Sequence, residues 1–322
     1  MAIPDLLRGR LRVPVIGAPM FLVSFPDLVK AQCKAGIVGT FPLLNARPAA
    51  LLDEWLTDIA DDLARYQADH PAAPVAPFGV NLVVHRSNAR FETDLDAVVR
   101  HRVPLVLTAL GHPGEVVRRV HDYGGLVFCD VTSAAHARKA AQSGVDGLIC
   151  VGAGAGGHAS AQSGFSLVRE IREFWRGCLV LGGAINDGHQ VRAAEMLGAD
   201  LAYVGTRFLA SAESNASADY KQMVIDATID DLVNSDRLSG IPCNWLRPSL
   251  ERAGVDLALL PPKAPDLSSL NDSGTRLWRD IWTAGHGVAT IHDAPPVAAL
   301  VDHIVEDYMA ACGLPVSPAV RG

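Results

Sequence analysis

The sequence predicts an α/β fold: a closed (β/α)8 TIM barrel with a C-terminal helical cap or subdomain. Eight short runs rich in Val, Ile and Leu alternate with helical patterns before residue 206, and several helical patterns end in glycine. The alternation of apolar runs and helical patterns ends after Phe208. Continuous apolar runs are typical of parallel strands buried on both faces, and eight such units fit a closed barrel better than an open doubly wound sheet.

The predicted elements follow in chain order. The strands are Val13–Met20, Gly36–Pro42, Phe78–Val84, Val103–Leu110, Leu126–Val131, Gly147–Val151, Cys178–Gly182 and Leu201–Gly205. Helical patterns lie between them, at Asp27–Lys34, Pro113–Tyr123, Ala134–Ser143, Leu167–Phe174 and Gly188–Leu197. C-terminal glycine caps are expected at Gly36, Gly124, Gly144 and Gly198. The long interval from Leu43 to Pro77 predicts an extra helix around Ala50–Tyr66.

The chain after Phe208 is longer than a barrel needs. Ala212–Asn234 looks helical, Ser235–Leu260 irregular, and Pro261–Gly274 is rich in Pro, Ser and Asp. A last helix is expected over about Pro295–Ala311. We therefore expect a barrel domain over residues 1–214, and the last barrel helix plus a cap or lid subdomain over residues 215–322.

Composition excludes several classes of protein. The 322 residues are 49% hydrophobic, and a net charge of -7 without a run of Lys and Arg argues against a nucleic-acid partner. The six cysteines are scattered singly, without zinc spacing, so we expect buried reduced thiols, no metal and a cytoplasmic protein. The sequence shows no secretory signal and no apolar run of the ~18 residues that a membrane span requires.

The loops that follow the strands of a barrel share one face, and active sites are built there. The candidate ligand-binding residues at these strand ends are Ala18, Pro19, Met20, Asn81, Asp130, Gly156, Gly157, Gly182, Gly183, Gly205 and Thr206. The glycine turns after strands seven and eight occupy the phosphate position of barrel enzymes, where free N–H groups hold an anion. A phosphorylated ligand is therefore expected, and glycine lets the backbone approach it closely.

Gly152-x-Gly154-x-x-Gly157 also matches a dinucleotide fingerprint, but its context does not. Five predicted strands come first, and neither a helix nor an acidic strand end follows at the required distance. The loop ends instead in His158, and a histidine at the catalytic face suits general base work at neutral pH. His112 and His286 are weaker candidates, as substrate or lid residues.

These residues resemble the nitronate monooxygenase family, formerly called 2-nitropropane dioxygenases, which are FMN-dependent barrels. The matching segments are Gly17–Met20, Phe78–Leu82, Ala155–His158, Leu181–Gly188, Leu197–Asp200 and Val204–Ser214. Two later segments look like those of NAD(P)H-dependent flavin oxidoreductases, namely Gly240–Ser249 and Trp282–Gly287. The chain departs from the family pattern at Gly154, where the family has glutamate, and at His286, where glutamine is expected.

The resemblance implies that FMN lies over the strand ends, with Asn81 bonding its ring system and His158 as the catalytic base. The implied reaction oxidises alkyl nitronates with dioxygen to a carbonyl compound and nitrite. Two alternatives stay open: an NAD(P)H-dependent FMN reductase of an enoyl thioester or quinone, and a flavin-free barrel isomerase or lyase acting on a phosphorylated metabolite. The expected partners are a small-molecule substrate and dioxygen, with NAD(P)H as reductant and a homodimer left open.

Overall fold

The computed structural model describes residues 2–264 and 277–314. Its core is one sheet of eight parallel strands: β1 (Val15–Gly17), β2 (Gly39–Pro42), β3 (Phe78–Val83), β4 (Leu105–Ala109), β5 (Leu126–Val131), β6 (Gly147–Val151), β8 (Cys178–Gly182) and β9 (Leu201–Val204). The strand order is β1-β9-β8-β6-β5-β4-β3-β2. The Gly17 N–H donates to the Val38 carbonyl at 2.7 Å and joins the two ends, which confirms the closed barrel.

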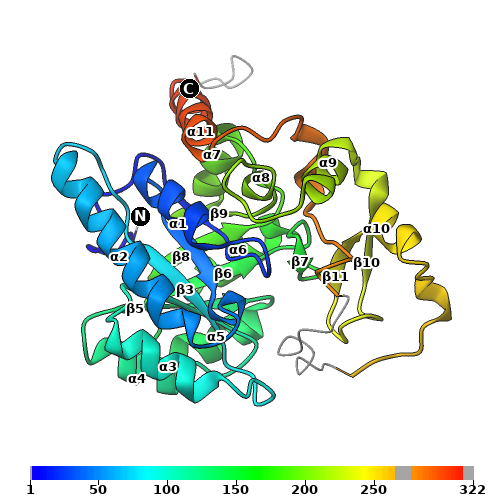
Figure 1. Cartoon of the computed structure of the whole chain (residues 1–322), viewed down its shortest axis with the longest axis horizontal. Helices are drawn as coiled ribbons and strands as arrows, with labels where there is room; N and C mark the ends of the chain where they lie inside the picture. The colour runs from blue at the N-terminus through cyan, green and yellow to red at the C-terminus, as the bar shows by residue number, and fades with distance from the viewer. Residues whose placement is uncertain (1, 265–276, 315–322) are drawn as a thin grey trace.

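One helix follows each of the first seven barrel strands, and these helices are labelled in Figure 1. They are α1 (Pro26–Lys34), α2 (Leu51–Asp69), α3 (Phe91–Arg100), α4 (Gly114–His121), α5 (Ala134–Gln142), α6 (Gly164–Arg172) and α7 (Gly188–Leu197). The helix expected as an extra element is α2, the regular connection between β2 and β3, and α3 was not among the expected helices. All four expected glycine caps have positive φ, so that prediction is confirmed.

The eighth barrel helix is α11 (Val297–Cys312), which packs against α7 and α1 (Figure 1). Its buried face presents Val297, Leu300, Val301 and Ile304 to the shared core. Residues 210–296, which we call the cap, are therefore inserted between β9 and the last helix. A barrel closed in space thus has one helix supplied from far along the chain.

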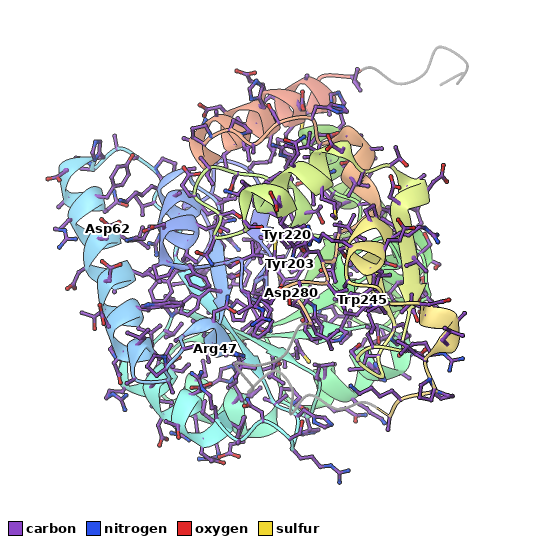
Figure 2. All side chains as sticks on the ribbon, turned by 45° about the vertical axis from the view of Figure 1, so that its right-hand side comes forward. Arg47, Asp62, Tyr203, Tyr220, Trp245 and Asp280 are labelled. Carbon is purple, nitrogen blue, oxygen red and sulfur yellow. The ribbon has the colours of Figure 1, made fainter. Side chains whose placement is uncertain are left out.

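The cap contains α9 (Ala218–Asp226), β10 (Leu232–Ser235), β11 (Cys243–Leu246) and α10 (Arg247–Arg252). β10 and β11 pair antiparallel, and β11 also pairs with β7 (Gly157–His158), the two-residue strand after β6. The expected helix over Ala212–Asn234 is wrong in its last part, because Val233 packs beside Trp245 as part of a strand. Trp245 lies among the yellow elements of the cap in Figure 2.

The segment expected to be irregular, Ser235–Leu260, holds β11 and α10, so that expectation is also wrong. Most of Pro261–Gly274 lies outside the described residues. Cys129, Cys150 and Cys178 are buried free thiols, as expected. Across the two described ranges, no helix combines the length and the apolarity needed to cross a membrane.

Candidate active site

A cavity of about 1170 Å³ lies at the carboxyl ends of the barrel strands, between the barrel and the cap. The predicted site residues that line it are Ala18, Pro19, Met20, Asn81, Asp130, Gly156, Gly157, His158, Gly182, Gly183, Gly205 and Thr206. His112 lies at its exposed edge. His286 is exposed and does not line the cavity, although both neighbouring glycines do.

His158 enters the cavity from β7 and is positioned by the cap. The His158 backbone pairs with that of Cys243 in β11, and the Ala159 N–H donates to the Pro242 carbonyl at 3.1 Å. The imidazole lies edge-on to Trp278, with 5.9 Å between ring centroids. Nε2 is buried and has no hydrogen-bond partner in the described part of the chain, and burial lowers the pKa of His158 to about 4. The ring is therefore neutral near pH 7 and able to accept a proton.

The glycine loop before His158 is fastened to the cap. The Asn244 side-chain amide donates to the carbonyls of Ala153 and Ala155, at 2.8 and 2.7 Å. A Cβ at Gly156 would lie 2.9 Å from the backbone nitrogen of Gly285. Glycine at 156 is therefore required by contact with the cap, which the sequence alone did not indicate.

The turns after β8 and β9 form an anion cradle. Gly183 has φ +121°, a conformation that favours glycine. The backbone N–H groups of Gly183, Gly205 and Thr206 donate to no acceptor among the residues described. The Thr206 hydroxyl accepts from the Gly285 N–H at 2.9 Å, which leaves its own proton for a ligand. Convergent N–H and hydroxyl donors fit the phosphate of FMN.

Asn81 and the segment after β1 form the opposite wall. The Asn81 side chain donates to the Leu107 carbonyl at 3.3 Å, which orients its amide in the second half of β3. The Ala18 N–H donates to the Val204 carbonyl at 2.8 Å and holds this segment against β9. These contacts fit the expected place of the flavin ring between two anchored segments.

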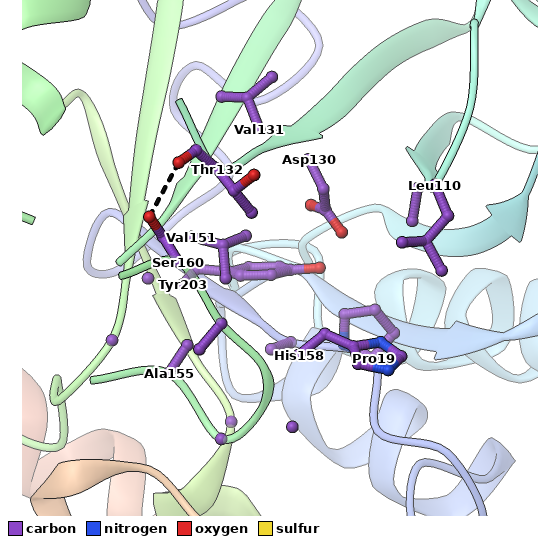
Figure 3. A pocket seen from close by; sticks show the side chains of 18 of the residues that line it. Pro19, Leu110, Asp130, Val131, Thr132, Val151, Ala155, His158, Ser160 and Tyr203 are labelled. Carbon is purple, nitrogen blue, oxygen red and sulfur yellow. Dashed lines mark hydrogen bonds between the residues drawn. The ribbon is translucent and has the colours of Figure 1, made fainter. Parts of the chain in front are cut away.

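Asp130 of β5 and Tyr203 of β9 form the floor of the cavity. In Figure 3 the Asp130 carboxyl and the Tyr203 hydroxyl point into the same space, beside His158 and Pro19. The Asp130 Oδ1 and the Tyr203 hydroxyl are buried without a hydrogen-bond partner in the described ranges. Burial raises the pKa of Asp130 to about 7 and the pKa of Tyr203 well above its usual value.

Tyr203 was not among the predicted site residues. It stands in an apolar strand, where an aromatic residue is typical of a packed core. Its place two residues after buried Leu201, next to the end of the strand, is the signal that could have located it.

The mouth of the cavity has an apolar side and a basic side. Its apolar side is one cluster of Phe21, Leu44, Val83, Leu110, Ile241 and Trp278. Its basic side carries His85, His112, His136 and Lys139, and Glu170 also lines the cavity. A substrate with both an apolar and an anionic part fits such a mouth.

Within residues 2–264 and 277–314, one group of potential metal ligands lies away from the cavity, between α7 and α11. Asp187, His189 and Asp307 bring ligand atoms within 4.8 Å of one another. Asp187 already caps α7 by accepting from the Gln190 N–H at 2.8 Å. Acidic groups near the surface often lie this close without an ion, and no second observation on the described residues indicates one.

A family model described as nitronate monooxygenase matches residues 58–307. A nitronate monooxygenase of Neurospora crassa is 27% identical over 91% of this chain and 88% of its own length. A (3aS,4S,5R,7aS)-5-hydroxy-7a-methyl-1-oxo-octahydro-1H-indene-4-carboxyl-CoA dehydrogenase of Mycobacterium tuberculosis is 29% identical over 74% of this chain.

The match spans only 64% of the length of that dehydrogenase, so it does not extend over the whole relative. Among solved structures, a point mutant of FabK from Thermotoga maritima superposes with a TM-score of 0.75. It is 25% identical, and the superposition covers 96% of this chain and 95% of the FabK chain.

Proposed function

Because the chain belongs to the nitronate monooxygenase family, we propose that this oxidoreductase uses FMN to oxidise alkyl nitronates with dioxygen to carbonyl compounds and nitrite. The observation that carries the proposal is the neutral, unpartnered His158 in a cavity whose far side offers an anion cradle. The similarity to the Neurospora nitronate monooxygenase extends over both chains and supports it.

FMN fits the donors that line the cavity. Gly183, Gly205 and Thr206 would hold its phosphate, while Asn81 and Ala18–Met20 would bound its ring. When bound, the flavin supplies the electron-accepting chemistry. The apolar side of the mouth excludes water from the space beside His158.

His158 performs the proton step when the substrate is a neutral nitroalkane. The bond from the α carbon to hydrogen breaks, its electron pair forms the C=N bond of the nitronate, and the proton passes to the imidazole. Burial keeps the imidazole neutral beforehand. The imidazolium that forms is then stabilised by the adjacent anionic nitronate, since opposite charges attract strongly in a low-dielectric site.

Nitrite release under air tests this proposal with two substrates. The wild type should release nitrite from ethylnitronate and from nitroethane. His158→Ala should lose about 100- to 10,000-fold of the rate with nitroethane, which still carries the proton, and less with ethylnitronate. His303→Ala, on the exposed face of α11, is the matched control and should behave as wild type. No nitrite from ethylnitronate with the wild type would refute the proposal.

An NAD(P)H-dependent reductase of an enoyl thioester or quinone is the second candidate. The cavity exceeds the ~300–1,000 Å³ typical of one small ligand, which leaves room for a second one beside the flavin. The basic side of the mouth suits an anionic group such as those of CoA or NAD(P)H. Rapid anaerobic reduction of the flavin by NADH or NADPH would favour it, and failure of both would reject it. Family membership argues against the flavin-free isomerase or lyase.

The cytoplasmic location, the homodimer and the individual roles of the site residues stay predictions. Gel filtration with light scattering would give the oligomeric state directly.

A further inference from the structure

The floor of the cavity carries two polar groups that the proposed reaction does not use. Asp130 and Tyr203 come from β5 and β9, and their Oδ1 and hydroxyl have no partner in the part of the chain described. Buried polar groups are almost always hydrogen-bonded, because leaving them unpaired costs free energy. Two such groups at one place therefore indicate that a ligand completes them.

Both side chains point to the inside of the barrel. Side chains alternate along a strand, and Phe128 and Leu201, two residues earlier, belong to the interior cluster of the barrel. Asp130 and Tyr203 form the next layer outward, at the cavity itself (Figure 3). Gly182 pairs with Tyr203 across β8 and β9, and its missing side chain leaves room for the tyrosine ring.

A ligand that contacts both Asn81 and the anion cradle must extend across this floor. Asn81 is on β3 and the anion cradle is on the turns after β8 and β9, so the anchors stand on opposite sides of the closed barrel. His158 approaches from the cap, whereas Asp130 and Tyr203 approach from the barrel. The ring of such a ligand would therefore lie between His158 and the floor.

We propose that the neutral carboxyl of Asp130 and the hydroxyl of Tyr203 form a hydrogen-bonding pair that holds the flavin ring from the barrel side, so that ionisation of Asp130 weakens flavin binding. This inference rests on the proposed function, in which FMN is the cofactor of the cavity. The neutral acid can donate a hydrogen bond to the ring. A carboxylate can only accept hydrogen bonds, and at this buried position its charge would have no partner.

Three other titratable side chains lie close to Asp130, and none of them changes its charge between pH 6 and pH 8. Tyr203 of β9 stays neutral because burial raises its pKa, and His158 of β7 stays neutral because burial lowers its pKa. Cys129, on the same strand, is a buried thiol whose pKa burial raises to about 11. The histidines at the mouth and Lys139 are present in every variant below, so comparison with the variant removes their contribution.

Flavin affinity as a function of pH tests the pair. Flavin-free wild type and Asp130→Asn are titrated with FMN and with riboflavin at pH 6 and pH 8, with flavin fluorescence as the readout. Riboflavin lacks the phosphate, whose own second ionisation near pH 6 would complicate the FMN curve. With a pKa of about 7 for Asp130, riboflavin should bind the wild type about tenfold more weakly at pH 8 than at pH 6. Asp130→Asn should show no such change.

Tyr203→Phe tests the second member of the pair. It should weaken riboflavin binding about five- to tenfold at both pH values, with the pH dependence retained. Tyr123→Phe is the matched control, because its hydroxyl donates to the Val103 carbonyl at 2.7 Å away from the cavity, and it should bind as wild type. Thermal melting followed by circular dichroism confirms that each variant is folded.

The outcomes separate the two proposals. Equal affinity of the wild type at pH 6 and pH 8, or the same pH dependence in Asp130→Asn, would overturn the inference and leave the proposed function standing. Failure of the wild type to bind either flavin at either pH would refute the proposed function and the inference together.

Discussion

His158 acquires its chemistry from burial and from the absence of a competing hydrogen bond. Its Nε2 is enclosed without a partner, and desolvation disfavours the charged ring. A base that is neutral over the whole working range is ready to accept the α proton as soon as the substrate binds. The cap supplies this environment through β11 and Trp278.

The pH dependence of proton abstraction follows from this environment. An imidazole with a pKa of about 4 is unprotonated above about pH 5, so kcat/KM for neutral nitroethane, at saturating FMN, should stay level from pH 7 down to about pH 5. Below pH 4 it should fall about tenfold per pH unit. Initial rates between pH 3.5 and 7 measure it. A decline that starts near pH 6.5 would show that His158 titrates as an ordinary solvated histidine.

The sequence located His158 and Asp130 but not Tyr203, and the reason is physical. A histidine that follows a loop with four glycines at a strand end has no evident structural purpose, so it indicates function. A tyrosine inside Leu201–Gly205 is explained equally well by packing. Only the structure shows that its hydroxyl is buried without a partner.

At the scale of elements, the site depends on the contact between the loop after β6 and the cap. β7, β10 and β11 form one small antiparallel sheet, and Asn244 of β11 fastens the two carbonyls of the loop. The loop therefore has its shape only when the cap is in place. A misplacement of about 1 Å at a reacting group can cost about 100-fold in rate.

The substitution Asn244→Ala tests the contact between this loop and the cap. Loss of both hydrogen bonds to the loop should lower kcat/KM about 10- to 100-fold, because the backbone that leads into His158 is no longer held. Steady-state kinetics measure it. Asn234→Ala is the matched control: it removes the bond from Asn234 to Asn244 at 2.8 Å but keeps the bonds to the loop. It should cost less than about threefold, and equal effects of the two substitutions would contradict the account.

The barrel strands were predictable and the sheet of the cap was not. The barrel strands are continuous apolar runs with glycine-capped helices between them, which is a local signal. β7 is only two residues long, and its partner β11 lies some 85 residues later, so no local pattern marks the pairing. The helical expectation for Ala212–Asn234 failed for the same reason, since β10 is stabilised by a partner strand.

At the scale of the whole molecule, the cap is enclosed by the barrel sequence rather than added after it. The chain leaves the barrel at β9, builds the cap over the strand ends and returns with α11 to close the ring of helices (Figure 1). Folding of the barrel therefore brings both ends of the cap to the mouth of the cavity. The predicted barrel was correct, but the place of its last helix between α7 and α1 required the structure.

The most direct measurement of the central claim is anaerobic mixing of the FMN-loaded protein with ethylnitronate, and in parallel with NADH and NADPH, while the flavin absorption is recorded. The account predicts that ethylnitronate bleaches the flavin rapidly and that readmitted air restores the colour with release of nitrite. It would be contradicted by a protein that takes up no flavin, or by a flavin that NADH or NADPH bleaches and ethylnitronate leaves unchanged.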